Sequence, residues 1–475
     1  MSFLKKIFYC LCGLFFMAFP AKINARAISD INTIDTNINK ITVRYILFAG
    51  NKKTKDYLIK REMQIKEGDQ LKRADIKKRI EKARQFVYNT ALFDEVNITY
   101  SFIHGNRIDI TTEVKERWYI YPIPQFQLVD RNFNDWLNNY NADLSRVNYG
   151  LKFTHYNTTG RRDQLRFTIL NGFTRMLSFS YTQPYSNKAL TEGFTIGTSF
   201  SQTRELAYIT SKDKTLSYSE GNFANTQWQI NGGYIFTKGA KEKHTYTAGY
   251  LDMKVPDSII IKNPDFFNDS SVKQRIIDFT YNYQYIDVDN VAYPLTGEQY
   301  MITAIKRGLG LTGNTNMFSI EGWANKFKDL HKEWYLSLQG NVKVKLPFKQ
   351  PYINQRALGY GEAFLRGMEN YVVDGVAYAL AKTTLKKKLV QFNINLPIRS
   401  KTFNKLPFTI FAKTFADFGY SYNKNKTNSY FSNRFLSTGG VGIDVLGLYN
   451  INVRIEYSFN QLGEKGLFLR TQSGF

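Results

Sequence analysis

Apolar and polar side chains alternate residue by residue along most of the chain after about residue 146. Near the end of the chain one series of alternate positions is apolar: Ile451, Val453, Ile455, Tyr457 and Phe459. The intervening series is polar or charged: Asn452, Arg454, Glu456 and Ser458. Because a strand sends successive side chains to opposite faces, this pattern predicts a wall with one apolar and one wet face. Such a wall separates lipid from a polar lumen in a membrane β-barrel.

Sixteen segments between residues 146 and 475 fit this strand pattern. They are 147–157, 162–171, 173–183, 192–202, 204–213, 224–237, 243–254, 272–286, 297–307, 315–328, 331–346, 376–398, 408–422, 433–446, 450–459 and 466–475. An even number of strands is typical of single-chain barrels, which close without a free edge. The longest connection, at about residues 347–375, is long enough to be functional or to fold inward. The sequence therefore predicts a 16-stranded antiparallel transmembrane β-barrel over residues 146–475.

The last candidate strand ends the printed sequence on a phenylalanine. Leu467, Leu469 and Phe475 share one face of this strand, and the other face is mostly polar. A soluble edge strand can show the same pattern. The alternation in the rest of the chain favours the closing strand of an outer-membrane barrel, which ends on an aromatic residue.

Residues 41–116 carry a different pattern, which predicts a small domain of order β-α-α-β-β. The first strand alternates from Ile41 and ends at the turn Gly50-Asn51. A helix then follows Thr54, and a second helix at about 73–89 carries one apolar stripe. Two alternating strands complete a unit with one buried face.

Residues 117–145 form a predicted connector between this domain and the barrel. The connector is rich in aromatic side chains, including Trp118, Tyr119 and Trp136. Pro122 and Pro124 exclude a helix there. We expect the connector to lie along the barrel mouth at the membrane interface.

Residues 1–27 match a secretory signal peptide. Lys5 and Lys6 precede an apolar run, and the small-residue site Ala25-Arg26-Ala27 follows it. We expect cleavage after Ala27, with cleavage after Ala25 as the alternative, and a flexible lead-in over residues 28–40. Both cysteines, at positions 10 and 12, lie within the signal, so the sequence predicts no disulfide and no cysteine metal site.

Composition agrees with an exported barrel. The net charge is +24, which suggests an anionic partner such as a membrane surface. Nucleic acid is excluded as a partner because the chain is predicted to leave the cytoplasm. No segment outside the signal reaches the roughly 18 consecutive apolar residues of a membrane helix, yet 16% of residues are aromatic. This combination is typical of a transmembrane β-barrel.

The small domain resembles a polypeptide-transport-associated (POTRA) domain. The matching residues are Gly50-Asn51-Lys52-Lys53-Thr54, then Gly68-Asp69, and then Leu92-Phe93-Asp94 before the second strand. An unrelated α+β domain is the alternative. The resemblance implies a domain on the periplasmic side that binds extended polypeptide by adding it to a sheet edge.

The barrel resembles the BamA/TamA family of outer-membrane assembly barrels. The family's signatures are an Arg-Gly pair in a long loop and a Phe-x-Asp-x-Gly element on a late strand. Here they are Arg366-Gly367 and Phe415 to Gly419. By strand parity Asp417 and Gly419 face the lumen. The resemblance implies that Arg366 pairs with Asp417 and holds the loop inside the barrel, while Gly367 lets the loop approach the wall.

One departure from the family concerns the strand at residues 376–398. The family places a second carboxylate there for the arginine, whereas this chain has Lys386, with Lys382 on the same face. Two inward lysines are expected to repel the arginine rather than hold it. Either the alignment slips along this strand or the contact differs in detail from that of the family, so Asp417 is preferred as the partner of Arg366 over any residue of this strand.

The last strand also resembles a β-signal, which an assembly machine recognises by strand addition. Related insertases open at the seam between their first and last strands. Here that seam is predicted between 147–157 and 466–475, with Gly150, Gly466, Leu469 and Phe475 as its functional residues. Glycine weakens a strand interior, which suits a gate.

The resemblance implies a protein that assists the insertion, assembly or translocation of other outer-membrane polypeptides. Its expected partners are outer-membrane lipid, client polypeptides and accessory lipoproteins. A dedicated secretion pore for a single exported protein, as in two-partner systems, is the alternative, because general assembly factors usually carry more than one POTRA domain. A barrel enzyme is a third possibility, but the sequence shows no Gly-x-Ser-x-Gly or His-Glu-x-x-His motif, and its four histidines are scattered. We therefore expect no catalytic residue, no metal and no cofactor.

Overall fold

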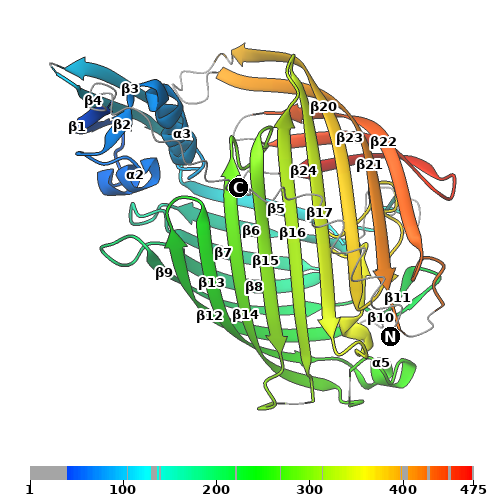
Figure 1. The fold of residues 1–475 in the computed structure, drawn as a ribbon. Coiled ribbons are helices and arrows are strands. Elements are labelled where there is room, and N and C mark those ends of the chain that lie inside the picture. The colour runs from blue at the N-terminus through cyan, green and yellow to red at the C-terminus, as the bar shows by residue number, and fades with distance from the viewer. Residues whose placement is uncertain are drawn as a thin grey trace, which may run out of the picture.

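The computed structural model describes two connected parts, a small α+β domain and a large sheet rolled into a barrel (Figure 1). The described residues are 40–103, 105–129, 136–137, 141–219, 222–267, 269–312, 314–395, 397, 405–424, 428–447 and 451–472. The predicted signal, most of the lead-in and Phe475 lie outside these residues. The small domain sits at one end of the barrel, which we call the POTRA end.

The small domain contains a four-stranded sheet and two helices. Its elements are β1 (Lys40–Ala49), α2 (Asp56–Met63), β2 (Gln70–Lys72), the 3-10 turn η1 (Arg73–Asp75), α3 (Ile76–Tyr88), β3 (Phe93–Ile103) and β4 (Arg107–Glu116). The strand order is β2-β1-β4-β3, with β1 parallel to β4. The predicted order of elements is correct except for β2, a three-residue strand that the sequence pattern did not predict.

The apolar side chains on one face of the helices pack against those on one face of the sheet and form a single core. Ile80, Ala83 and Val87 of α3 face Ile108 and Ile110 of β4 in this core. Gly50 ends β1 with a φ of 87°, and a Cβ there would lie 1.9 Å from the carbonyl oxygen of Val114. The turn that the sequence predicted at this position therefore needs glycine for both its backbone angle and its close contact.

The barrel is a single 16-stranded sheet in which each strand pairs antiparallel with the next strand of the sheet. Its strands are β5 (Ile120–Leu128), β6 (Val147–Tyr156), β7 (Gln164–Gly172), β8 (Thr174–Gln183), β9 (Glu192–Thr203), β12 (Asn225–Lys238), β13 (Glu242–Lys254), β14 (Lys273–Val288), β15 (Gly297–Arg307), β16 (Met317–Asp329), β17 (Trp334–Leu346), β20 (Ala377–Asn395), β21 (Lys405–Tyr422), β22 (Phe435–Leu446), β23 (Asn452–Asn460) and β24 (Lys465–Gln472). The predicted number of strands is confirmed.

Two of the predicted assignments are wrong: one predicted wall strand lies outside the wall, and one wall strand lies in the predicted connector. The total number of strands is correct because one error adds a strand and the other omits one. The segment 204–213 forms β10 (Leu206–Ser211), which pairs with β11 (Lys214–Tyr218) in a separate hairpin outside the wall. The wall instead begins at β5, within the predicted connector, so the barrel starts earlier than residue 146. Pro122 and Pro124 are tolerated in β5 because it is an edge strand of the sheet.

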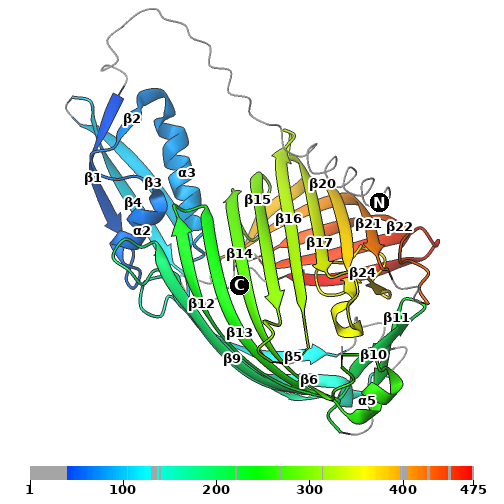
Figure 2. The same cartoon turned by 60° about the horizontal axis from the view of Figure 1, so that its bottom comes forward.

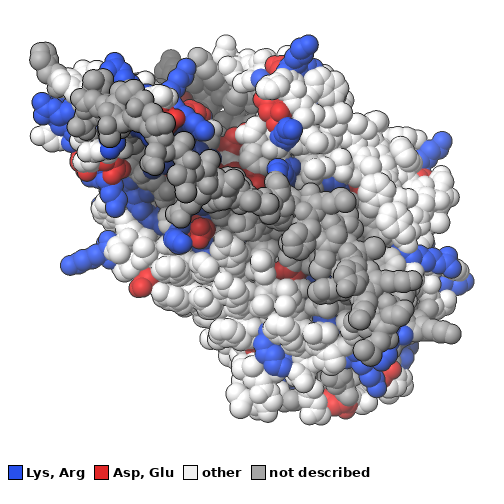
Figure 3. Space-filling model, viewed as in Figure 1, with Lys and Arg blue, Asp and Glu red and all other residues white. Residues whose placement is uncertain are grey.

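The two faces of the wall differ as the alternation predicted. On β16, Phe318 and Ile320 are exposed on the outside, whereas Ser319 between them is buried inside. In Figure 3 charged side chains gather over the small domain and at the barrel rims, and most of the barrel surface that is visible between them is uncharged. None of the helices in the described residues is both long and apolar enough to cross a membrane.

The end of the barrel opposite the POTRA end is covered by loops. The β10–β11 hairpin and α5 (Asp257–Lys262) share a core with Phe266 and the loop that follows β17 (Figure 2). Asp213, at the tip of the hairpin, accepts hydrogen bonds from Ser429 and from the backbone N–H of Tyr430. Because Tyr430 lies in the loop between β21 and β22, this aspartate joins two distant parts of the rim.

Candidate functional site

The long connection between β17 and β20 folds into the barrel, and we call it the inner loop (residues 347–376). It contains the 3-10 turn η3 (Tyr352–Asn354) and the short strands β18 (Arg356–Leu358) and β19 (Val373–Asp374). Leu358 and Leu365 of the loop pack with Leu380 of β20 and Leu436 of β22 in one buried cluster. The loop is thus anchored against the inside of the wall, as its length predicted.

Arg366 of the inner loop contacts Asp417 of β21 inside the barrel. The Arg366 Nε donates to Asp417 Oδ2 at 2.9 Å, Nη2 donates to Oδ1, and the backbone N–H of Arg366 donates to Oδ2 at 2.9 Å. Asp417 is 0% exposed and Arg366 8% exposed. The guanidinium carbon lies 3.9 Å from the centroid of the Phe415 ring. The predicted contact is therefore present as a bidentate, buried ion pair stacked on an aromatic ring.

The two lysines of β20 do not prevent this contact. The Lys382 ammonium lies 4.0 Å from the centroid of the Phe364 ring, and that of Lys386 lies 3.9 Å from the centroid of the Tyr293 ring. Between them Thr384 accepts a hydrogen bond of 3.1 Å from Arg366 Nη1. Arg366 keeps its pair with Asp417 beside these lysines, because each ammonium lies against an aromatic face and a hydroxyl occupies the position next to the arginine.

A second carboxylate does reach Arg366, from a strand that the sequence analysis did not consider as the source of a partner for it. Glu456 of β23 lies 3.9 Å from Arg366 Nη1, 2.7 Å from Lys413 Nζ and 3.4 Å from Arg470 Nη1. Arg470 of β24 also pairs with Glu369 of the inner loop. Charged groups on β21, β23 and β24 therefore form one network with the inner loop. The alternation of charged residues on β23 was the signal that these side chains face inward.

Both glycines of the predicted site lie where the inner loop touches the wall. Gly367 has a φ of 93°, and a Cβ there would lie 3.0 Å from Ser458 of β23. A Cβ on Gly419 would lie 2.8 Å from the side chain of Leu365. A larger residue at 367 is strained by the positive φ and lies tight against Ser458, whereas one at 419 requires the end of the Leu365 side chain to move.

The predicted seam residues are not brought together. Gly150 lies in β6, between β5 and β7, so it is not at an edge of the sheet. Gly466 and Leu469 do lie in the last strand, β24, paired with β23. Phe475 lies outside the described residues. Because β5 is the first strand, the seam lies between β5 and β24, and no ladder joins these two strands in the part of the chain that the structure describes.

A buried ionic contact fastens the small domain to the barrel. Arg61 of α2 stacks on Tyr185, which follows β8, with 4.1 Å from its guanidinium carbon to the ring centroid. Glu62 accepts hydrogen bonds from Tyr185 Oη at 2.7 Å and from Arg61 Nη1 at 2.9 Å, and Arg162 of the β6–β7 turn lies 3.6 Å away. Tyr185 and Leu190 also belong to the core of the small domain. Burial raises the pKa of the Tyr185 hydroxyl above its usual value, so this side chain remains a neutral donor.

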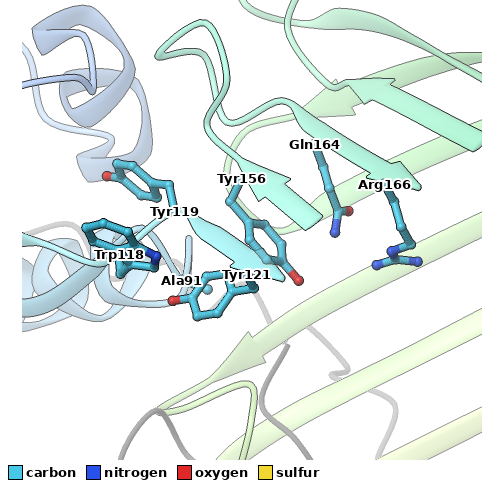
Figure 4. A pocket seen from close by; sticks show the side chains of 7 residues that line it. All are labelled: Ala91, Trp118, Tyr119, Tyr121, Tyr156, Gln164 and Arg166. Carbon is cyan, nitrogen blue, oxygen red and sulfur yellow. The ribbon is translucent and has the colours of Figure 1, made fainter. Parts of the chain in front are cut away.

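A cavity of about 250 Å³ lies where the small domain meets the first barrel strands (Figure 4). Its lining is mostly aromatic: Ala91, Trp118, Tyr119, Tyr121, Tyr156, Gln164 and Arg166. Trp118 and Tyr119 come from the segment that enters β5, and Arg166 lies on β7. The predicted aromatic connector is thus partly the wall of this cavity and partly strand β5.

Comparison with known proteins agrees with this architecture. A family model described as POTRA, surface antigen variable number repeat, matches residues 41–117. The crystal structure of BamA from Haemophilus ducreyi lacking POTRA domains 1–3 has a TM-score of 0.52 and 16% identity, over 91% of this chain and 84% of that chain. CdiB from Escherichia coli has a TM-score of 0.54 and 12% identity, over 91% of this chain and 76% of that chain. No curated protein matches the sequence at a significant level.

The comparisons confirm the small domain as a POTRA domain and the whole chain as similar in fold to BamA and CdiB. At identities of 16% and 12% the structural likeness concerns the fold alone. The architecture is thus a POTRA domain on a 16-stranded β-barrel.

Proposed function

We propose that this POTRA-plus-barrel protein, which has the fold of BamA and CdiB, assists the insertion and assembly of other outer-membrane polypeptides. In this proposal the barrel lies in the outer membrane and the POTRA domain in the periplasm. Clients are outer-membrane polypeptides with exposed strands. Strand pairing and apolar burial drive the process, so no nucleotide or metal takes part.

One observation carries the proposal: the lumen is occupied while the seam is not paired. Arg366 and Asp417 hold the inner loop within the barrel, and the loops at the far end pack over the mouth. The first strand β5 and the last strand β24 share no ladder in the described residues. The edges of β5 and β24 therefore present backbone groups with which a client polypeptide can form hydrogen bonds. Passage of a polypeptide through the lumen would instead require the inner loop to leave the barrel.

The POTRA domain offers a second place for an extended client. Strand β3 is an edge of the POTRA sheet and pairs only with β4 among the residues described. An extended peptide can add to such an edge through main-chain hydrogen bonds. The buried contact of Arg61 and Glu62 with Tyr185 keeps this edge at a constant position relative to the barrel. Accessory lipoproteins are proposed as further partners of the domain.

A dedicated secretion pore for one exported protein is the second candidate. The likeness to CdiB and the single POTRA match favour it. In this case the inner loop and the Asp213 contact at the rim open to let a chain pass through the lumen. The Arg366–Asp417 pair then acts as a gate rather than as a permanent anchor.

Depletion of the protein from its cells distinguishes these functions. We expect the amounts of several unrelated outer-membrane barrel proteins to fall several-fold, measured by quantitative proteomics of isolated outer membranes. Restoring the natural chain from a plasmid serves as the control and returns these amounts to normal. Loss of a single exported protein with unchanged barrel proteins supports the secretion pore instead. If neither class of protein changes, both functions are wrong.

A further inference from the structure

Five consecutive strands of the barrel, β8, β9, β12, β13 and β14, carry a row of outward-facing side chains near the end opposite the POTRA end (Figure 1). Cross-strand pairing places one residue from each strand side by side: Arg175, Gln202, Thr226, Lys254 and Lys273. Directly paired residues share a face of the sheet. Lys254 and Lys273 are exposed, whereas Met253 and Gln274 beside them are buried on the inner side. The row therefore lies on the outer surface of the wall.

The basic side chains in and next to this row are only partly balanced by acids. We call Arg175, Lys254, Lys273 and Arg275 the basic cluster. Asp252 Oδ2 lies 3.0 Å from Lys273 Nζ and 3.4 Å from Arg275 Nε, and among the described residues it is the one carboxylate that pairs with this cluster. Lys254 and Lys273 lie directly opposite each other on neighbouring strands, where like charges destabilise a sheet. An anion bound between the two ammonium groups removes this repulsion.

An aromatic ring holds the guanidinium group at the other end of the row. The guanidinium carbon of Arg175 lies 4.9 Å from the centroid of the Phe223 ring, and that of Arg204 lies 5.2 Å from the same centroid. Phe223 belongs to the connection between β11 and β12. A guanidinium that rests on an aromatic ring can still donate several N–H groups to a phosphate. Both ends of the row thus carry cations that are able to bind phosphate.

Apolar surface begins directly beside the basic cluster, on its POTRA side. The next row of paired residues contains Leu177, Phe200 and Trp228, and all three side chains are exposed. The row after that contains Phe179 and Ile230, which are also exposed. Cations that border an apolar outer surface fit a lipid with an anionic head and several acyl chains.

The POTRA end of the same strands has a different composition. There a row of paired residues on β9, β12, β13 and β14 is wholly aromatic: Phe194, Tyr234, Tyr246 and Tyr281. The cation next to it, Lys238, lies directly opposite an acid, Glu242. Aromatic girdles are usual at both interfaces of a membrane barrel, so they do not distinguish the two leaflets. The excess of cations at one end does distinguish them.

We propose that the basic cluster binds the phosphates of a phosphorylated glycolipid of the lipid A type, whose acyl chains lie on Leu177, Phe200 and Trp228. The inference rests on the proposed function for its orientation: with the POTRA domain in the periplasm, this end of the barrel lies at the outer leaflet. Three strand spacings, about 14 Å, separate Arg175 from Lys254. A disaccharide with a phosphate at each end can span this distance, whereas a phospholipid with one phosphate reaches only one end of the row.

Native mass spectrometry of the full chain in detergent, titrated with lipid A that carries two phosphates, tests this inference. We expect Lys254→Gln with Lys273→Gln to lower the affinity for lipid A at least tenfold. Lys326→Gln with Lys328→Gln is the matched control, because it removes two exposed lysines of β16 at the POTRA end. This control is expected to bind lipid A as the natural chain does. Equal affinities of the two double variants overturn the proposal.

Two further lipids and one further variant test whether both ends of the row are used. The natural chain is expected to bind lipid A with two phosphates at least tenfold more tightly than lipid A with one phosphate or phosphatidylglycerol. Arg175→Gln is expected to abolish the preference for the second phosphate. Heat-modifiable migration in gels checks that every variant still forms the barrel. Phosphatidylglycerol that binds as tightly as lipid A, or a preference that persists in Arg175→Gln, contradicts the assignment.

This outcome is separate from that of the depletion experiment. If depletion leaves other barrel proteins unchanged but lipid A still binds through Lys254 and Lys273, the proposed function fails and the lipid site stands. If depletion has its expected effect and the two double variants bind lipid A equally, assembly stands and the lipid site fails.

Discussion

Arg366→Ala is expected to release the inner loop from the barrel wall. The change leaves Asp417 as a carboxylate with 0% exposure that has lost its bidentate partner and removes a donor to Thr384. Breaking one side of a buried ion pair costs about 3–5 kcal/mol. Because each 1.4 kcal/mol is tenfold in a population, the released loop becomes at least about a hundred times more populated. Asp417→Asn is expected to act in the same direction, since it removes the charge that Arg366 faces.

Cysteine labelling measures this release. Within the described residues the chain has no cysteine, and Val372 of the inner loop is buried. In a Val372→Cys background, Arg366→Ala is expected to raise the rate of maleimide labelling in intact outer membranes by about a hundredfold. Arg275→Ala is the matched control, because Arg275 pairs with Asp252 at an exposed site where an ion pair contributes about 0–1 kcal/mol. Equal labelling rates for the two variants contradict the anchoring role of Arg366.

Glu62→Ala is expected to loosen the POTRA domain from the barrel. Glu62 is 2% exposed and accepts from Arg61 and Tyr185, with Arg162 close by. Its loss leaves two guanidinium groups facing each other without their shared carboxylate, at a cost of about 3 kcal/mol. Arg61 still donates to the carbonyl oxygens of Leu190 and Gly239 in two barrel loops, so the junction is weakened rather than lost. The domain itself remains folded because Glu62 is not part of its apolar core.

Limited trypsin digestion of outer membranes measures the loosening. The fragment containing the POTRA domain is expected to be released at least tenfold faster from Glu62→Ala than from the natural chain. Glu67→Ala serves as the matched control, because Glu67 pairs with Lys60 at the surface and its loss is expected to change little. Release at the same rate in both variants shows that Glu62 does not fasten the domain.

The POTRA domain was predictable because its signals are local. The apolar stripe of α3 and the alternation of β3 and β4 each depend on a few neighbouring residues. Strand β2 was missed because three residues are too few for a period of two to be recognised. Gly50 and Gly68 both have positive φ values, which explains why turn residues located the ends of the elements correctly.

The barrel wall was predictable as a pattern but not as a set of pairings. The β10–β11 hairpin alternates as the wall does, and only its pairing outside the large sheet distinguishes it. Strand β5 was assigned to a connector because its many aromatic residues suggested the membrane interface, and Pro122 and Pro124 were used only to exclude a helix. Prolines are also uncommon inside a sheet. An edge strand tolerates them, but which strand is an edge depends on how the whole sheet closes.

The site was predictable only in part, for a similar reason. The alternation of side chains along β21 indicated that Asp417 faces the lumen. The resemblance to the BamA/TamA family indicated Arg366 as its partner, and the two residues are in contact. Thr384, Glu456 and Arg470 were not predicted as neighbours of the loop. Their contacts depend on the path of the inner loop across three strands, which no local pattern encodes.

Fluorophore scanning along β16 tests the central claim most directly, namely that the sheet is a wall between lipid and a polar lumen. A bimane label is attached to single cysteines at positions 318, 319, 320 and 321 in liposomes that contain spin-labelled lipid. Because Phe318 and Ile320 are exposed on the outer face and Ser319 is buried inside, the account predicts strong quenching at 318 and 320 and little at 319 and 321. Equal quenching at all four positions, or a protein that stays in solution without lipid or detergent, contradicts it.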